Sequence, residues 1–268
     1  SVLLFNVLYQ LKDDLGFEIK TCHINHSYRV TADRDENFSR EISEEKNIQF
    51  FSKKVDMKQF SIDNSISLED SGRILRYNCF NKVLETENFN KIAVAHHLDD
   101  QVETFFLHLF RGSGIDGLCG IQYRNKNVIR PLLDVSKNEI LNYLDSNNIE
   151  YVTDETNFIA DVKRNKIRLE MLPYIQENFN NSINESIYRT INILQDSKEI
   201  IDDITNLKFE KLVSQRNGEY SIDVKLFEIE KISIQRNIIR KLLIELNGSN
   251  QNIRMAYIDD IIELFDLK

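Results

Sequence analysis

The sequence contains only three cysteines, Cys22, Cys79 and Cys119, and no two of them are neighbours along the chain. An odd number of cysteines without a C-x-x-C pair argues against a zinc or redox motif and suits free thiols in a reducing compartment. Long apolar runs are also missing, since none approaches the roughly 20 residues that a membrane-spanning helix needs. The first residues do not show the basic and then apolar pattern of a secretion signal. We therefore expect a cytoplasmic protein without a membrane partner.

The chain also lacks an excess of positive charge. It has 34 lysines and arginines and 43 aspartates and glutamates, which gives a net charge of −9. A surface with this balance does not attract nucleic acid as a whole, so a polyanionic partner would need a local basic patch. The 268 residues do contain enough apolar side chains, 41%, for a sizeable core in one large domain or two smaller ones.

Apolar spacing in the first half of the chain alternates between the helical and the extended pattern. Ser67 is expected to begin one helix through a capping box with Asp70, and Gly16 to end the first helix. The expected helices cover 2–15, 32–47, 67–87 and 98–110, and the expected strands cover 17–24, 48–55 and 91–95. The last strand is a continuous apolar run of the kind that is buried on both faces. This alternation predicts an α/β fold with a doubly wound parallel sheet, whose ligand site lies at the carboxyl ends of the strands.

The second half of the chain is dominated by helical spacing. Two further helices are expected at 136–148 and 161–179, and the residues after them show only one candidate strand, 218–224. We place a boundary near Asn180, which gives an α/β domain over 1–180 and a smaller helical domain over 181–268.

Polar groups are unusually dense directly after the apolar strand at 91–95. His96 and His97 end that strand, and Asp99 and Asp100 fall in the first turn of the next helix, where acidic side chains are favoured. Glu103 lies three and four residues further on, so the three carboxylates can share one helix face. Carboxylates beside a phosphate site would hold Mg²⁺, with Asp99 and Asp100 as the candidate ligands. Two other interpretations stay open, which are simple helix capping and a transition-metal site built from His96, His97 and Asp100.

A glycine-rich segment follows this helix. Gly112, Gly114, Gly117 and Gly120 are spaced so that the backbone can turn tightly and approach a ligand, although such a segment can also be a plain helix exit. Arg111 at its start and Arg130 further along supply planar cations that suit phosphate oxygens.

Together these residues resemble the signature of the tRNA(Ile)-lysidine synthetase family. The members of this family are PP-loop ATP pyrophosphatases with the adenine nucleotide alpha hydrolase-like fold. The signature is AHHLDDQVETFFLHLFRGSGIDGLCGI, and similar elements occur in order at 23–29, 67–77, 128–133 and 151–173. The phosphate loop of that family, S-G-G-x-D-S, is absent, and Ser1 fits its last serine. We therefore expect further residues before Ser1. Residues 176–268 resemble the helical second domain of the family only in character.

The resemblance implies a two-step reaction on the cytidine at the first anticodon position of an isoleucine tRNA with the anticodon CAU. ATP, with Mg²⁺, adenylates O2 of the base and releases pyrophosphate. Free lysine then attacks C2 through its ε-amine and expels AMP, which leaves lysidine. The amine must be neutral to attack, so a nearby carboxylate or histidine is expected to take its proton. Unpaired anticodon bases can be splayed into such a pocket.

The resemblance also assigns roles to individual residues. The expected catalytic residues are Asp100, His96, His97, Asp99, Glu103, Arg73 and Arg76. The expected nucleotide-binding residues are Ser1, His23, Asn25, His26, Arg111, Gly112, Ser113 and Gly114. The expected tRNA-binding residues are Arg130, Lys163, Arg164, Asn165 and Arg168, with Lys166 in the same basic run. His108 is expected to be structural, and Tyr123 and Phe158 are candidates for base stacking or plain packing.

Several alternatives remain at this point. Within the same superfamily, a tRNA thiolase would want paired cysteines, and the amide-forming relatives fit the RGSGIDGL and RNKIR segments poorly. From other classes, a metal-dependent phosphohydrolase or a non-enzymatic adenosine-binding module would explain part of the pattern. The sequence leaves the oligomeric state open, a homodimer included.

Overall fold

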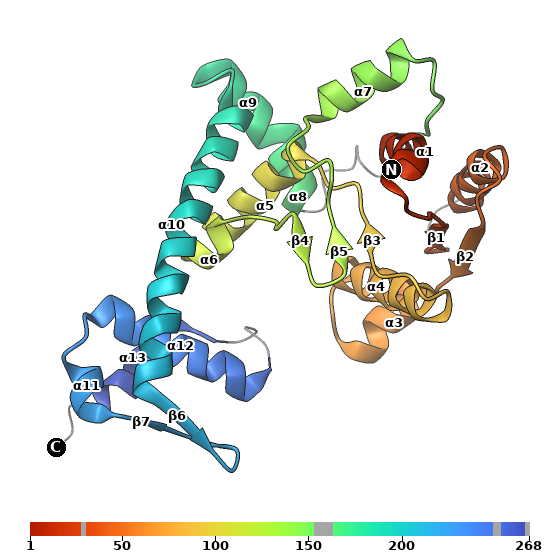
Figure 1. Cartoon of the computed structure of the whole chain (residues 1–268). Coiled ribbons are helices and arrows are strands. Elements are labelled where there is room, and N and C mark those ends of the chain that lie inside the picture. Colours follow the sequence, from red (N-terminus) through yellow and green to blue (C-terminus); the bar gives the residue numbers. More distant parts are fainter. Residues whose placement is uncertain (28–30, 153–162, 249–252, 266–268) are drawn as a thin grey trace. The chain divides into compact units, whose positions relative to one another are not determined.

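A computed structural model describes residues 1–27, 31–152, 163–248 and 253–265 of the chain, and these residues form two compact units (Figure 1). Unit 1 is Ser1–Arg189 and unit 2 is Thr190–Lys268. The division falls within a long helix, α10 (Ile183–Leu212). No helix in the described part of the chain is both long enough and apolar enough to cross a membrane.

Unit 1 alternates helices and strands as its apolar spacing predicts. Its elements before α10 are α1 (Val2–Leu15), β1 (Thr21–Asn25), α2 (Ala32–Glu44), β2 (Phe50–Lys54), α3 (Met57–Asn64), α4 (Leu68–Thr86), β3 (Ile92–Ala93), α5 (Leu98–Phe110), α6 (Ile115–Leu118), β4 (Arg124–Asn125), β5 (Val128–Ile129), α7 (Lys137–Ser146), α8 (Lys163–Lys166), the π-helical turn η2 (Ile167–Met171) and α9 (Leu172–Asn178). The apolar spacing did not predict α3, which begins where the Asp56 side chain accepts a hydrogen bond from the Gln59 N–H.

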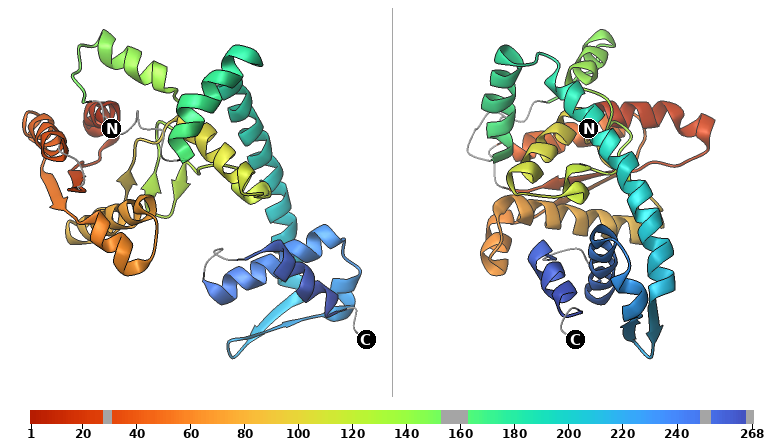
Figure 2. Two further views of the ribbon diagram at one scale, coloured as in Figure 1. Left: turned by 180° about the vertical axis from the view of Figure 1, so that it is seen from behind. Right: turned by 90° about the vertical axis from the view of Figure 1, so that its left-hand side faces the viewer.

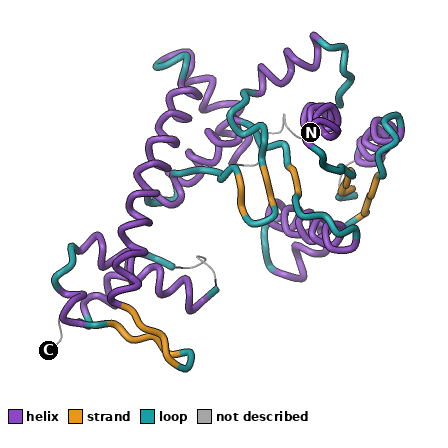
Figure 3. The backbone as a smooth tube through the Cα atoms, in the orientation of Figure 1, coloured by secondary structure: helices purple, strands orange, loops and turns teal. Residues whose placement is uncertain are grey.

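The strands of unit 1 form two groups (Figure 3). Strand β1 pairs in parallel with β2, while β3 pairs in parallel with β5 and β5 pairs antiparallel with β4. This parallel pairing, together with the helices between the strands, confirms the α/β class. The expected strand 91–95 is shorter than predicted and only half-buried, because among the described residues β3 has one strand neighbour, β5.

Helices cover the strands of unit 1 from two sides, as the right-hand view of Figure 2 shows for α1 and α4. On one side, Leu3 and Leu4 of α1 pack with Leu132 and with Leu144 of α7. On the other, Cys79 of α4 packs with Ile24 of β1.

The expected helix ends at Gly16 and Ser67 are confirmed. Gly16 takes the left-handed conformation, with φ of 66°, that glycine adopts most readily after a helix. Ser67 Oγ accepts a hydrogen bond of 3.1 Å from the Asp70 N–H, and donates one of 2.7 Å to Asp70 Oδ2.

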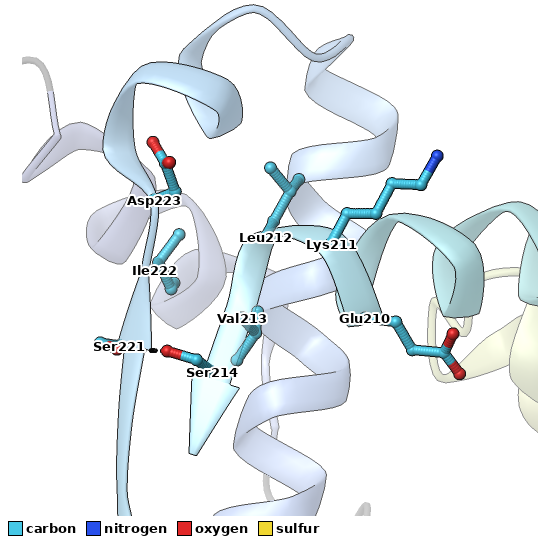
Figure 4. Close-up of a pocket in the computed structure, with 8 residues that line it drawn as sticks. All are labelled: Glu210, Lys211, Leu212, Val213, Ser214, Ser221, Ile222 and Asp223. Carbon is cyan, nitrogen blue, oxygen red and sulfur yellow. Dashed lines mark hydrogen bonds between the residues drawn. The ribbon is translucent and has the colours of Figure 1, made fainter. Parts of the chain in front are cut away.

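Unit 2 joins the end of α10 to a hairpin and three helices. These elements are β6 (Val213–Arg216), β7 (Glu219–Ile222), α11 (Val224–Glu228), α12 (Ile232–Asn247) and α13 (Met255–Glu263). Its core includes Phe209, Phe227, Ile238 and Ile258. Helices dominate as expected, but β6 was not anticipated. An open hollow of about 380 Å³ lies beside the hairpin and is lined by residues 210–214 and 221–223, whose side chains are drawn in Figure 4.

Candidate active site

Histidine and aspartate side chains surround the start of α5, directly after β3. The backbone N–H of His97 donates a hydrogen bond of 3.0 Å to Asp100 Oδ2, which caps the helix. The His97 ring bridges the two aspartates, because Nδ1 lies 3.4 Å from Asp99 Oδ2 and Nε2 lies 3.5 Å from Asp100 Oδ2. The carboxylates that the sequence placed on one helix turn therefore lie around one imidazole.

Asp99 connects this turn to two other helices. Its Oδ2 accepts a 2.8 Å hydrogen bond from the N–H of Lys137, the first residue of α7, and its Oδ1 accepts one of 3.2 Å from Asn184 Nδ2 in α10. Burial would raise the pKa of Asp99, but the nearby His97 ring and the hydrogen bond from the Lys137 N–H outweigh burial and lower the pKa. Both oxygens of Asp99 are therefore engaged within the protein.

The carboxylate of Asp100 has fewer hydrogen-bond partners than that of Asp99. One oxygen caps α5, and the other, Oδ1, lies 3.9 Å from Arg168 Nη2, which is too far for a hydrogen bond. Ser1, at the amino end of α1, lies near Asp100. Asp100 thus combines an available carboxylate oxygen with the amino ends of two helices, which favour anionic ligands.

Glu103 is fully buried and is held by two arginines. Arg168 Nε and Nη2 donate to Glu103 Oε1 and Oε2 over 2.6 and 3.0 Å, the two-pronged geometry that matches a guanidinium to a carboxylate. Arg164 Nε lies 3.4 Å from the same Oε2, and its Nη2 donates to Thr104 Oγ1 over 2.9 Å. Burial raises the pKa of the Glu103 carboxyl, and the arginines oppose that shift without reversing it.

The basic run at 163–168 therefore divides into two faces. Arg164 and Arg168 point toward α5, and Asn165 is half-buried, whereas Lys163 and Lys166 are exposed. Helical spacing predicts which of these side chains share a face, but it does not tell which face turns toward α5.

Arg130 is buried and reaches back to His96. Its Nε donates to His96 Nδ1 over 3.1 Å, and its Nη1 donates to the Gln122 carbonyl over 2.7 Å. Burial lowers the pKa of His96 to about 4, with Arg130, Arg164 and Arg76 adding to the shift and Asp100 opposing it. His96 is therefore neutral at physiological pH.

The glycine segment after α5 is fastened to that helix at two points. His108 Nδ1 lies 2.6 Å from the Gly117 carbonyl oxygen. The buried Gln101 donates to the Ile121 carbonyl over 2.8 Å and accepts from the Ile121 N–H over 2.6 Å. At Gly114, a Cβ would meet nothing within 4 Å, and the backbone does not have a positive φ. Neither packing nor backbone conformation requires glycine at 114, so its bare backbone faces open space.

Asn25, at the end of β1, is fully buried and holds the loop that follows. Its Nδ2 donates to Asp33 Oδ1 over 2.7 Å and to Glu36 Oε2 over 2.9 Å, while its Oδ1 accepts from the Ser27 N–H over 2.9 Å. The side chain is thus occupied within the protein, where it holds the backbone after β1.

The remaining expected residues are distributed over the surface around these elements. Arg73, Arg76, Arg111 and Gly112 are exposed, and Ser113 is half-buried. His23 Nδ1 lies 3.2 Å from Ser39 Oγ, and the His26 ring lies beside Gly72 of α4. Tyr123 pairs its hydroxyl with that of Tyr188 at 2.9 Å. Phe158 lies outside the described residues.

Gln101, Thr104 and Asn184 were missed by the sequence analysis. Each is a neutral polar residue whose partner is 20 to 85 positions away along the chain. The available signal was a buried-face position in a helix filled by a polar side chain, as at Gln101 and Thr104, since such a side chain needs a partner.

The sequence of this chain is similar to a known protein family and to individual relatives. The model of the PP-loop domain family matches residues 1–175. The chain is 39% identical over 240 residues to the tRNA(Ile)-lysidine synthase of Petrotoga mobilis, which covers 90% of this chain and 74% of the relative. The chain belongs to the tRNA(Ile)-lysidine synthase family of PP-loop proteins. The resemblance inferred from the signature is confirmed.

Other members of the lysidine synthase family are longer than this chain. It is 36% identical to the tRNA(Ile)-lysidine synthases of Clostridium tetani and Clostridioides difficile, with 98% and 99% of the chain aligned. The chain spans 57% and 58% of the lengths of these two relatives. Its fold also resembles that of the U34-tRNA thiolase NcsA from Methanococcus maripaludis, at a TM-score of 0.56 and 15% identity over 73% of this chain and 68% of the thiolase.

The cysteines of this lysidine synthase family member are packed in its core. Cys22 interacts with Cys79, and burial raises the pKa of Cys22 to about 12, so its thiol stays protonated. Cys119 is fully buried. A buried thiol with a raised pKa, such as that of Cys22, is a poor nucleophile and a poor metal ligand.

His96 gives this family member a pH-dependent stability that can be measured. Its folded pKa of about 4 lies below the unfolded value of about 6.5, so the unfolded chain binds more protons between these values. The contribution of neutral His96 to the free energy of unfolding is therefore fully present above pH 6.5. It is lost as the pH drops from 6.5 to 4, by up to about 3 kcal/mol. We expect chemical denaturation at pH 7 and pH 5 to show this loss in the wild type and a smaller loss in His96→Gln. An equal loss in both proteins would contradict the assignment.

Proposed function

We propose that the chain is the catalytic part of an enzyme that joins lysine to the cytidine at the first anticodon position of an isoleucine tRNA with the anticodon CAU. ATP adenylates O2 of the base and releases pyrophosphate; the lysine ε-amine then attacks C2 and releases AMP. Family membership implies the use of ATP, and a cytoplasmic location suits a tRNA-modifying enzyme. The observation that carries the proposal is the convergence of Asp100, His96, His97 and the buried Glu103 at the start of α5.

Asp100 is the group best suited to handle the incoming amine. It keeps an oxygen without a short hydrogen bond, and its carboxylate would take the proton that the lysine ammonium must lose before attack. Glu103 and Arg168 hold the neighbouring helix turn in place, so that this oxygen keeps its direction.

The nucleotide would lie over the amino end of α1, beside the glycine segment. Helix amino ends bind phosphates through their free N–H groups, and Ser1 is the first residue of that end. Gly114 offers bare backbone that a ribose or base can approach closely. Arg73, Arg76 and Arg111 are exposed cations that would neutralise the leaving pyrophosphate.

Asp100 would hold Mg²⁺ together with phosphate oxygens only during adenylation, because the same oxygen must be free to take the lysine proton in the second step. No group of three or more histidine, cysteine, aspartate or glutamate side chains in the described part of the chain is arranged to hold a metal. Mg²⁺ does not require such a group, since it is commonly held by one or two carboxylates and by phosphates. Asp99 was the other expected ligand, and its two oxygens are already engaged. When bound, the ion would neutralise charge on the triphosphate.

The exposed lysines of α8 are the best candidates for tRNA phosphates. Lys163 and Lys166 lie on the free face, whereas Arg164 and Arg168 are engaged with Glu103. Two local cations are compatible with a net charge of −9, because affinity depends on the phosphates neutralised at the contact. Unit 2 would contribute further tRNA contacts, and a homodimer would be compatible with this arrangement.

The test is the transfer of radiolabelled lysine to a tRNA transcript. We expect full-length protein with ATP and Mg²⁺ to label an isoleucine transcript carrying CAU. A matched transcript with UAU, which lacks the cytidine, should stay unlabelled. No label on the CAU transcript, from protein that is folded, would reject the proposal.

A further inference from the structure

We infer that His96 is a neutral hydrogen-bond donor to an anionic substrate oxygen, and that Arg130 fixes the ring tautomer that makes it one. This inference rests on the proposed function, and it separates the role of His96 from that of His97.

The tautomer follows from the bond between Arg130 and His96. An arginine Nε always carries a proton and can only donate, so His96 Nδ1, 3.1 Å away, must be the acceptor. In a neutral imidazole the proton is then on Nε2. Arg130 cannot easily turn away, because it is buried and its Nη1 also donates to the Gln122 carbonyl over 2.7 Å.

Among the residues that the structure describes, Arg130 makes the one hydrogen bond to the His96 ring, at Nδ1, so Nε2–H can donate to a ligand. The ring belongs to the chain segment between β3 and α5, at the carboxyl end of the strand where an α/β fold binds its ligand.

Charges around the ring indicate what kind of ligand that is. Arg130, Arg164 and Arg76 act electrostatically on His96 from three different segments, against the single carboxylate of Asp100. This excess of positive charge favours an anionic oxygen, and the proposed reaction supplies one as a phosphate oxygen of ATP or of the adenylated cytidine.

With this tautomer, His96 cannot act as the general base that takes the proton from lysine. Nδ1 is occupied by Arg130 and Nε2 already carries a proton, so the neutral ring has no free lone pair for the lysine ammonium. Proton removal from lysine then falls to Asp100 or His97.

Two substitutions separate a donor from a structural residue. Glutamine places an amide N–H near the position of Nε2 and loses the acceptor for Arg130. Asparagine places its amide near the position of Nδ1, so it can still accept from Arg130 but has no donor toward the ligand. Glutamine therefore keeps only the hydrogen-bond donor toward the ligand, and asparagine keeps only the acceptor for Arg130.

We expect adenylation of the CAU transcript by full-length protein, measured without lysine, to fall about tenfold or more further in His96→Asn than in His96→Gln, because the lost bond is to a charged oxygen. Equal losses in the two variants, or a larger loss in His96→Gln, would overturn the inference. If the wild type itself adenylates no tRNA, the proposed function fails instead.

The tautomer can be read without activity. Nitrogen-15 NMR of histidine-labelled wild-type protein should show an unprotonated Nδ1 and a protonated Nε2 for His96, assigned by comparison with His96→Gln. A protonated Nδ1 would overturn the inference whatever the kinetics.

Discussion

Glu103→Ala should lower the free energy of unfolding by about 2 to 4 kcal/mol and abolish lysine transfer. Glu103 is fully buried, and its removal leaves Arg168, which is only about a fifth exposed, without its two-pronged partner. Arg164 loses an ion-pair partner as well. This loss of free energy of unfolding is small for a broken buried ion pair, because Arg168 can turn partly toward water. Urea denaturation of the wild type and the variant measures the difference.

Glu69 provides a matched control. It faces the same Arg164 at 3.9 Å, but its side chain is 59% exposed, so Glu69→Ala should change stability by less than about 0.5 kcal/mol. A second control replaces Glu103 together with its two-pronged partner, as Glu103→Leu with Arg168→Met. Arg164 then keeps its hydrogen bond to Thr104 and its contact with Glu69, so this double variant should recover part of the stability without recovering activity. A Glu103→Ala protein as stable as the wild type would show that the pair is not what holds α5 to α8.

Asp100→Asn should reduce lysine transfer by a factor of about 100 or more while changing stability by less than about 1 kcal/mol. Asparagine can still accept the hydrogen bond from the His97 N–H, so the start of α5 is preserved. It cannot take a proton from an amine, and it is a weaker ligand for Mg²⁺. Single-turnover transfer to the CAU transcript, with circular dichroism as a check on folding, measures both effects.

Asp70 is the counterpart of Asp100 at the start of another helix. It accepts a hydrogen bond from its own cap residue, Ser67, at the surface. Asp70→Asn should therefore have a similar small effect on stability and leave lysine transfer unchanged. Wild-type rates in Asp100→Asn would remove this carboxylate from the chemistry.

Local patterns allowed the order of elements to be predicted, and also the position of the histidine and aspartate cluster directly after a strand. Gly16 and Ser67 ended and began helices as expected, since these signals involve neighbouring backbone only. The cluster from His96 to Asp100 was placed correctly after a strand because the apolar run before it is continuous. These predictions need no knowledge of how distant segments meet.

Contacts between distant segments could not be predicted in the same way. Arg168 lies 65 positions from Glu103, and Arg130 lies 34 from His96. Both arginines were expected at tRNA phosphates, because an arginine suits a phosphate and a carboxylate equally well. Asn25 was expected at the nucleotide, and its amide is instead held by Asp33 and Glu36. The roles that follow from these contacts are proposals that the experiments above address.

Arg164 and Arg168 both contact one buried carboxylate, that of Glu103. This shared contact limits which segments can be exchanged between relatives to make chimaeric proteins. A chimaera whose crossover falls between α5 and α8 takes Glu103 from one parent and its two arginines from the other. Any parent that uses a different polar arrangement there would supply a mismatched half. Segment exchange among relatives should therefore move residues 98–110 and 163–171 as one block.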